Sequence, residues 1–490
     1  MIALLLTVFT PFLGIGVLAL IRNPRTAGWG NIIFSAISFV ASILLVIGIL
    51  RHGPFTVSQF HCDSFNVYLV LLTTFIGLTT AVFSRRYMEN SLEQGRVTPR
   101  RMQLYHSLYQ GFMFTMLLAL TTDNLGILWV AVEGATLTTV LLVSLHRTPE
   151  AIEAAWKYFI LCSVGIAEAL FGTVLVYFAA QHTDLPSGQG LSWDALYAVA
   201  HNLDPKVMTV AFVFLIVGYG TKVGLVPMHN WLPDAHSESP TPISALLSGL
   251  LLNVALYAVI RFKMLVDGAL APSAHPHLAS YLLMGFGLLS FLVAGLFMQR
   301  QQDVKRLFAY SSIEHMGLIT FGFGLGGPIA TFAALLYMAA HSLTKSAIFA
   351  SVGHATHVAK TQAIDHIRGL IRTQPAVGWG LLIGVVAIAG LPPFGIFSSE
   401  FLLITVSIRH YPWAAALLIL GLIIAFSGLF RHVQPMVYGP VPACQEPIKA
   451  NMLPVALHLA LVLILGFAAP LFFTHWLEQA ARLIVGGGVR

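Results

Sequence analysis

The sequence predicts an all-α integral membrane protein, and its composition and its hydropathy pattern both indicate that fold class. Of the 490 residues, 57% are hydrophobic and only 9% are charged, and the mean hydropathy is +0.81. A soluble domain carries about 25% charged residues. The apolar residues also gather into stretches of about twenty, the length that a helix needs to cross a bilayer.

Fourteen such stretches predict about fourteen transmembrane helices, which form a single membrane domain over residues 1–490. The first stretch lacks a basic segment and a small-residue cleavage site, so we expect a retained helix and not a signal peptide. The fourth and tenth stretches give the weakest signal. The predicted helices lie at 1–21, 29–50, 64–84, 107–122, 124–145, 157–180, 207–227, 238–262, 277–298, 308–325, 328–352, 376–397, 412–431 and 452–474.

The connections between these helices differ in charge on the two sides of the membrane. The odd-numbered connections carry seventeen Lys and Arg residues, whereas the even-numbered ones carry five, among them Arg261 and Lys263. Cytoplasmic connections are enriched in Lys and Arg. We therefore expect the odd-numbered connections on the cytoplasmic side of the cell inner membrane. Both termini are then outside, because the number of helices is even.

Lys222 lies inside a predicted helix, in the segment VGYGTKVGLVPMHNWLPDAH at 217–236. A charge at the centre of a membrane helix costs about 2.5–3.5 kcal/mol on insertion scales, so such a residue usually has a function. The segment also contains several glycines and two prolines. Because proline removes a helical hydrogen bond, we expect the seventh helix to be discontinuous, with non-helical backbone near 218–224.

A second interrupted segment, GLPPFGIFSSEF at 390–401, places two prolines inside the twelfth predicted helix and Glu400 just after them. We expect non-helical backbone near 390–396. The two interruptions are about 170 residues, or five helices, apart, which is the pattern of inverted repeats in transporters. The first predicted repeat contains helices 4–8 (residues 107–262), and the second contains helices 9–13 (residues 277–432). Helices 1–3 (residues 1–106) precede the repeats, and helix 14 with the C-terminus (residues 450–490) follows them.

Other ionisable residues also fall inside predicted helices and are candidates for a proton pathway. Glu133 lies on the fifth helix, Glu314 and His315 lie on the tenth, and His341 and Lys345 share one face of the eleventh. A buried Glu–Lys arrangement binds or releases a proton for little free energy, because burial and the opposite charge shift each pKa in opposing directions. The structural alternatives are a satisfied core histidine at His315 or His341 and a helix cap at Glu400. Glu168, on the sixth helix, could pair with a neighbour or face a lumen.

The sequence also excludes several functions. Cys62, Cys162 and Cys444 are scattered without metal-site spacing, and no phosphate-binding loop is present, so we expect no cofactor or metal in this chain. The pI near 9.2 could suggest a nucleic-acid partner. In so apolar a chain, the basic residues instead set the topology, and we expect no nucleic-acid binding.

Four motifs resemble one family closely. They are EAAWKYFIL, GTKVGLVPMHNWLPDAHSESPTPISALLSG, DVKRLFAYSSIEHMG and GLPPFGIFSSEF. The chain is similar, over nearly its whole length, to the antiporter-like membrane subunits of respiratory complex I, Mrp sodium/proton antiporters and membrane-bound nickel–iron hydrogenases. LLLNVALYAVIR and the Glu–His pair of SSIEHMG most resemble the component F branch of hydrogenase-4.

The resemblance implies roles for individual residues. Glu133 and Lys222 would form the modulating ion pair of the first half, and His315, Lys345 and Glu400 would form the central relay and the second half-channel. Asn253 departs from the pattern, because many relatives have a lysine or histidine there. The central path is then interrupted unless water, Glu314 or His341 bridges it.

The leading hypothesis is a proton-translocating, antiporter-like subunit of a complex I-related hydrogenase or dehydrogenase, moving protons or sodium. The resemblance implies other membrane subunits as partners, together with a peripheral redox arm that holds the iron–sulfur clusters and the nickel–iron site. One alternative is a structural spacer in the membrane arm, which Asn253 favours. Another is an Mrp-type antiporter or a component of inorganic-carbon uptake.

Overall fold

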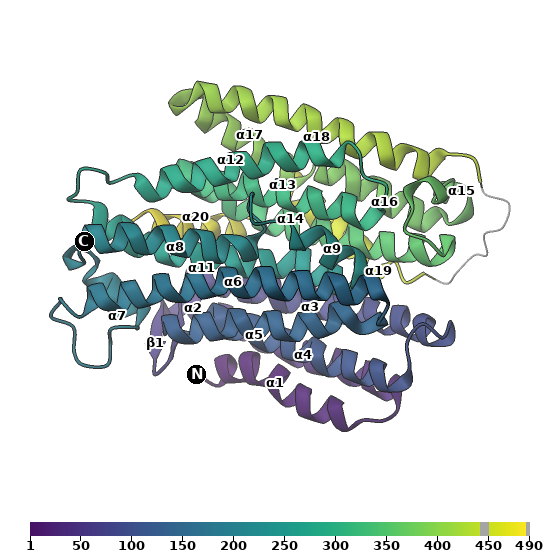
Figure 1. Ribbon diagram of the computed structural model, residues 1–490, viewed down its shortest axis with the longest axis horizontal. Coiled ribbons are helices and arrows are strands. Elements are labelled where there is room, and N and C mark those ends of the chain that lie inside the picture. The colour runs from purple at the N-terminus through teal and green to yellow at the C-terminus, as the bar shows by residue number, and fades with distance from the viewer. Residues whose placement is uncertain (442–449, 487–490) are drawn as a thin grey trace.

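The computed structural model is a bundle of helices that run side by side along its long axis (Figure 1). It describes residues 1–441 and 450–486. Residues 442–449 and 487–490, and with them Cys444, Lys449 and Arg490, lie outside the described residues. Within the described ranges the only strands are β1 (Phe55–Val57) and β2 (Phe60–Cys62), which pair antiparallel. The predicted all-α class is confirmed.

The first part of the chain, up to residue 223, contains long helices. Two short helical elements follow α6. The elements are α1 (Ile2–Leu20), α2 (Pro24–His52), α3 (Ser64–Glu93), α4 (Pro99–Thr121), α5 (Leu125–Val143), η1 (Ser144–His146), α6 (Pro149–Ala180), α7 (Trp193–Ala198), η2 (Ala200–Asn202) and α8 (Pro205–Val223). The hairpin β1–β2 and α7 lie at one end of the long helices, and α15 lies at the other (Figure 1).

The second part contains shorter elements between the long helices. They are α9 (Trp231–Glu238), α10 (Thr241–Leu246), the π-helix η3 (Leu247–Leu251), α11 (Leu252–Leu270), α12 (Leu278–Met298), α13 (Val304–Leu325), α14 (Gly327–Ala359), η4 (Ile364–His366), α15 (Leu370–Thr373), α16 (Pro375–Ile388), α17 (Gly395–His410), α18 (Pro412–Tyr438), α19 (Leu453–Phe467) and α20 (Leu471–Val485).

In the part of the chain that is described, ten helices are long and apolar enough to cross a membrane, or eleven if α19 and α20 form one bent span. The predicted fourth and tenth spans form α4 and α13, of 23 and 22 residues, but neither belongs to this set. The predicted last helix at 452–474 is not continuous, because α19 and α20 meet at 77°. Pro470 directly precedes α20 and disfavours helical backbone in the residue before it. The count of fourteen and the repeats stay predictions.

The first predicted break is displaced along the chain. Helix α8 continues through Gly218 and Lys222, and the backbone leaves the helix only at Gly224, whose φ of +83° is left-handed. The non-helical segment is 224–230, so the expectation for 218–223 is wrong. Gly218 serves packing instead, because a Cβ there would collide with the backbone of α6 at Gly165 and Ala169.

The second predicted break is confirmed for most of its length. Helix α16 ends at Ile388 and α17 begins at Gly395, so residues 389–394 are non-helical. Gly390 adopts a φ of +66°, which favours glycine. A Cβ at Gly390 would collide with the carboxylate of Glu400.

The eighth predicted helix differs in both its start and its end. It begins at Thr241, contains the π-helix Leu247–Leu251, and extends to Leu270 instead of ending at 262. Arg261 and Lys263 therefore lie inside a helix and not in a connection, which corrects the assignment of these two cations to an outer loop. Arg261 tolerates this position because it is paired with a buried carboxylate, described below.

Candidate functional site

The first group of buried polar residues surrounds Lys222 in the last turn of α8. Lys222 is fully buried, and its Nζ donates to Oγ1 of Thr136 on α5. Thr136 Oγ1 donates to Oε2 of Glu133 at 2.9 Å, and Ser163 Oγ of α6 donates to Oε1 of Glu133 at 3.1 Å. The Lys222 ammonium also lies 5.1 Å from the centre of the Tyr158 ring. One hydroxyl thus joins the lysine to the carboxylate.

The sequence explains this geometry locally. Glu133 and Thr136 are three residues apart on α5 and so lie on one face of that helix. Helices α6 and α8 approach closely because Gly165 faces Thr221 and Gly218 faces the Gly165 carbonyl. The structure brings the predicted partners Glu133 and Lys222 together. Among the described residues, however, they form no direct ion pair within 4.0 Å, and the sequence reasoning missed the bridging Thr136.

Asn253 on α11 lies beside the π-helix. It is 2% exposed, and its Nδ2 donates to Ser342 Oγ of α14 at 2.6 Å and to the Gly249 carbonyl at 3.3 Å. Ser342 Oγ donates to the same carbonyl at 2.6 Å. Oδ1 of Asn253 has no hydrogen-bond partner in the described part of the chain. Asn253 therefore lies among polar groups and not in apolar packing, and π-helical turns often occur at functional sites.

The second group joins α13, α14 and α17. Tyr337 Oη donates to Glu400 Oε1 at 2.7 Å, and His315 Nδ1 lies 2.7 Å from the same hydroxyl. Since the tyrosine proton points to Glu400, His315 Nδ1 is the donor in the second bond. His315 Nε2 lies 3.2 Å from Glu314 Oε2. Two hydrogen bonds thus join His315, Tyr337 and Glu400. Glu314 lies close to His315, but Glu314 Oε2 and His315 Nε2 have no hydrogen-bond partner among the described residues. We call these four side chains the Tyr337 relay.

His341 and Lys345 lie on α14 beside this relay. The rings of His315 and His341 have centres 5.7 Å apart. Lys345 is fully buried, and its Nζ donates to the Phe308 carbonyl at 3.0 Å. The structure describes no direct bond between Lys345 and Glu400, because Tyr337 occupies the position next to the carboxylate. Tyr337, His341 and Lys345 recur every four residues, and this spacing is the signal that could have found Tyr337.

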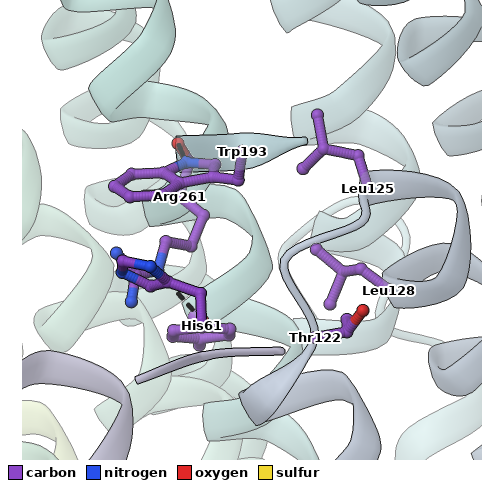
Figure 2. Close-up of a pocket in the computed structure, with 7 residues that line it drawn as sticks. His61, Thr122, Leu125, Leu128, Trp193 and Arg261 are labelled. Carbon is purple, nitrogen blue, oxygen red and sulfur yellow. Dashed lines mark hydrogen bonds between the residues drawn. The ribbon is translucent and has the colours of Figure 1, made fainter. Parts of the chain in front are cut away.

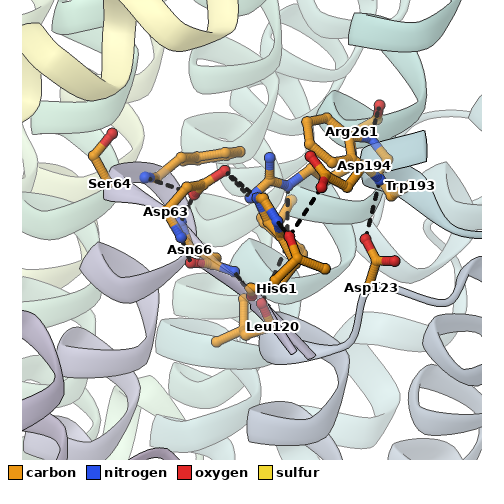
Figure 3. A network of polar contacts seen from close by, with 12 residues as sticks. His61, Asp63, Ser64, Asn66, Leu120, Asp123, Trp193, Asp194 and Arg261 are labelled. Carbon is orange, nitrogen blue, oxygen red and sulfur yellow. Dashed lines mark hydrogen bonds and ion pairs between the residues drawn. The ribbon is translucent and has the colours of Figure 1, made fainter. Parts of the chain in front are cut away.

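A third polar cluster lies at the end of the bundle that carries the β-hairpin (Figure 3). Arg261 Nη2 lies 2.7 Å from Asp63 Oδ2, and both side chains are buried. The guanidinium stacks over the Trp193 ring at 4.3 Å, and Arg261 Nε donates to Tyr257 Oη at 3.0 Å. Asp63 also caps α3 by accepting from the backbone N–H groups of Phe65 and Asn66.

Burial alone would raise the pKa of the Asp63 carboxyl. The Arg261 guanidinium and the hydrogen bond from His61 outweigh burial and hold this pKa well below its ordinary value. His61 also bonds to Thr56, which donates to Asp194 of α7 at 3.0 Å. The cluster therefore ties the hairpin, α3, α7 and α11 to one another.

A cavity of about 10 Å³ adjoins this cluster (Figure 2). His61, Thr122, Trp193 and Arg261 are among the residues that line it. Such a volume holds one water molecule and no organic substrate. In residues 1–441 and 450–486 no group of three or more His, Cys, Asp or Glu side chains could hold a metal ion. The expectation that cofactors belong to partner subunits stays a prediction.

The chain has helices long and apolar enough to cross a membrane, and hydrogen bonds join titratable side chains in the interior of the bundle. These features are those of an antiporter-like membrane protein. The chain belongs to the NADH:quinone oxidoreductase/Mrp antiporter transmembrane family, whose model matches residues 122–425. It is 47% identical over 476 residues to a hydrogenase-4 component F homolog of Methylacidiphilum infernorum, covering 97% of this chain and 98% of the relative. The predicted resemblance is confirmed.

Solved structures show the same fold. A chain of the membrane-bound sulfane sulfur reductase, an archaeal respiratory membrane complex, superposes with a TM-score of 0.87 at 22% identity, covering 99% of this chain and 98% of that one. A chain of the Mrp complex from Dietzia sp. DQ12-45-1b gives a TM-score of 0.86 at 19% identity with the same coverage. Both neighbours are chains of complexes, and at these identities the likeness shows the fold of this chain.

Removing the Thr136 hydroxyl should weaken the link between Lys222 and Glu133. We expect Thr136→Val, which keeps the side-chain shape, to lower ion translocation about tenfold, since a hydrogen bond to a charged group contributes about 1.5–3 kcal/mol. Thr136→Ser retains the hydroxyl and should keep most of the activity. The ion-translocation rates would be compared in reconstituted vesicles. Equal rates for the valine variant and the parent would exclude a role for the Thr136 hydroxyl in translocation.

Proposed function

We propose that this chain is a proton-translocating subunit of a complex I-related hydrogenase or dehydrogenase in the cell inner membrane. The observation that supports this most directly is the Tyr337 relay, because hydrogen bonds join three of its buried side chains and the fourth, Glu314, lies 3.2 Å from His315. The relative that is 47% identical to this chain is named as a hydrogenase-4 component F homolog. Electron transfer, with its iron–sulfur clusters and nickel–iron site, would take place in a peripheral redox arm.

A proton moves along the relay by an exchange of bonds. Tyr337 gives its hydroxyl proton to Glu400 and takes the Nδ1 proton of His315, while His315 Nε2 takes a proton from Glu314. One proton leaves Glu314, one arrives at Glu400, and Tyr337 and His315 stay neutral. The relay is reset when Glu400 releases its proton to the exit side, Glu314 binds a new proton, and the His315 ring and the Tyr337 hydroxyl rotate back to their starting orientations. Each transfer spans a heavy-atom distance of 2.7–3.2 Å.

The two halves of the proposed path meet near Asn253. An amide does not titrate at physiological pH, so Asn253 cannot hold the proton itself. Ser342 accepts its hydrogen bond and directly follows His341 in sequence, and we assign the bridging role to this serine and histidine. Moving one charge against 100 mV costs about 2.3 kcal/mol, so the path needs energy from the redox partners.

A structural spacer without transport of its own is the second candidate, and Asn253 is the observation that favours it. The two functions differ in what the intact complex does. Reconstituted into vesicles and supplied with electrons, the complex should acidify one side in sodium-free buffer, as reported by a pH-sensitive dye. An equal proton-to-electron ratio in the parent and in the Thr136→Val and Glu400→Gln variants would contradict translocation by this chain and support the spacer.

The proposed orientation places the connection between α3 and α4 in the cytoplasm. We expect a Gln94→Cys variant to react with a membrane-impermeant maleimide only after the membrane is opened, whereas Ser187→Cys, on the opposite side, reacts in intact cells. Both positions are exposed, while Cys62 and Cys162 are buried and give little background. Cys444 would be replaced by serine. If Gln94→Cys instead reacts in intact cells and Ser187→Cys only after the membrane is opened, the chain has the opposite orientation.

A further inference from the structure

Glu168 differs from the other carboxylates in the interior of the long helices. Glu133, Glu314 and Glu400 each have a hydrogen bond or an ionic contact. Glu168, on α6, is partly exposed and has no hydrogen bond or ion pair with any residue that the structure describes. The Tyr337 relay and the Lys222 group do not use it.

The surface around Glu168 is apolar. Leu161, Val164 and Phe171 precede or follow it by seven, four and three residues, so they share its side of α6. These side chains are 41%, 58% and 49% exposed. Helix α6 runs along the outside of the bundle between α5 and α8 (Figure 1). We call Leu161, Val164, Glu168 and Phe171 the Glu168 face.

The depth of Glu168 follows from the contact between α6 and α8. These helices approach most closely where Gly218 meets Gly165 and Ala169. Glu168 is adjacent to Ala169, so it lies at the level of Gly218, about one helical turn from Lys222. It belongs to the apolar span Pro149–Ala180 and is twelve residues from the nearer end of that helix. A lipid headgroup does not reach this depth.

A carboxylate exposed at that depth cannot be satisfied by hydrocarbon, so protein must cover it. We propose that the Glu168 face docks against a transmembrane helix of a partner subunit that presents a Lys or Arg side chain to Glu168. A basic side chain supplies both the opposite charge and the hydrogen-bond donors that the carboxylate lacks. The surrounding apolar side chains would exclude lipid from the contact.

A second copy of this chain does not fit as the occupant. Over the described ranges, Lys345 is the one Lys or Arg residue that is, like Glu168, at least twelve residues from both ends of its helix, and Lys222 lies about one turn from the level of Gly218. Both are fully buried, so neither is available on the surface at the required depth. The inference rests on the proposal that the chain is a subunit of a membrane complex, but it does not depend on proton transport.

Photo-crosslinking in the intact complex tests the inference. Benzoylphenylalanine at Phe171 should form an adduct with one other membrane subunit, at a residue within about one helical turn of a Lys or Arg. The same probe at Ile423, which is 61% exposed on α18, is the control for unspecific capture. An adduct with lipid only, with a second copy of this chain, or with a segment that lacks Lys and Arg would overturn the proposal, as would identical adducts from both positions.

A charge reversal gives the second measurement. We expect Glu168→Lys to lower the assembled fraction of the complex at least about tenfold, since removing one partner of a buried charge pair at an interface has effects of this size or larger. Replacing the crosslinked base of the partner by Glu should restore assembly. Full assembly of Glu168→Lys would overturn the proposal, and an intact crosslink without proton transport would instead count against the proposed function.

Discussion

Replacing Arg261 by leucine is expected to lower the free energy of unfolding by about 3–5 kcal/mol, because it leaves the Asp63 carboxylate buried without its counter-charge. Asp63 would keep the two backbone bonds of the α3 cap and the contact with His61, but these do not neutralise its charge. The leucine would also lose the stacking of the guanidinium over Trp193. Denaturant titration in detergent micelles measures the difference.

The Asp63→Asn/Arg261→Leu double variant is the matched control. Asparagine still caps a helix and carries no charge, so the double variant should recover about half of the lost stability. If the double variant is no more stable than Arg261→Leu alone, the uncompensated charge is not the cause of the loss.

The same pair predicts a dependence on pH. Because the folded-state pKa of Asp63 lies below its unfolded value of about 3.9, its contribution is complete above that value. The contribution is lost as the pH falls through the folded-state pKa. The parent should therefore lose more stability than Asp63→Asn when the pH is lowered from about 5 to 3.

Local signals in the sequence were enough for the fold class and for the second break. Most apolar stretches of about twenty residues correspond to helices in the described chain, and Pro392 and Pro393 mark the second break because proline does not continue a helix. The first break was displaced because glycine permits a helix as well as a turn, and close packing against α6 keeps Gly218 helical. The π-helix Leu247–Leu251 leaves no recognisable signature in its sequence, LSGLL.

The candidate site was predictable only as a set of residues. A charge in an apolar helix stands out in any sequence, which is why Lys222, Lys345 and Glu400 were found. Their partners are hydroxyls from other helices, and Thr136 and Tyr337 are ordinary components of an apolar stretch. Arg261 was placed in a loop because its partner, Asp63, is about 200 residues earlier, and no spacing rule connects the two.

Glu400→Gln is expected to reduce proton translocation about a hundredfold, which is the lower range for the loss of a proton-transfer group. Glutamine keeps the size of the side chain and still accepts the hydrogen bond from Tyr337, but it cannot take up the proton at the end of the relay. The complex should assemble normally. The proton-to-electron ratio in reconstituted vesicles is the measurement, because electron transfer takes place elsewhere.

Tyr337→Phe distinguishes the relay from a helix cap. Glu400 lies against Gly390 in the break between α16 and α17, so its carboxylate could serve only to stabilise that backbone. A cap does not need the tyrosine hydroxyl, whereas the relay loses its connection between His315 and Glu400. We therefore expect Tyr337→Phe to lower the proton-to-electron ratio as Glu400→Gln does. A normal ratio in both variants would leave Glu400 as a cap and remove the relay from the proton path.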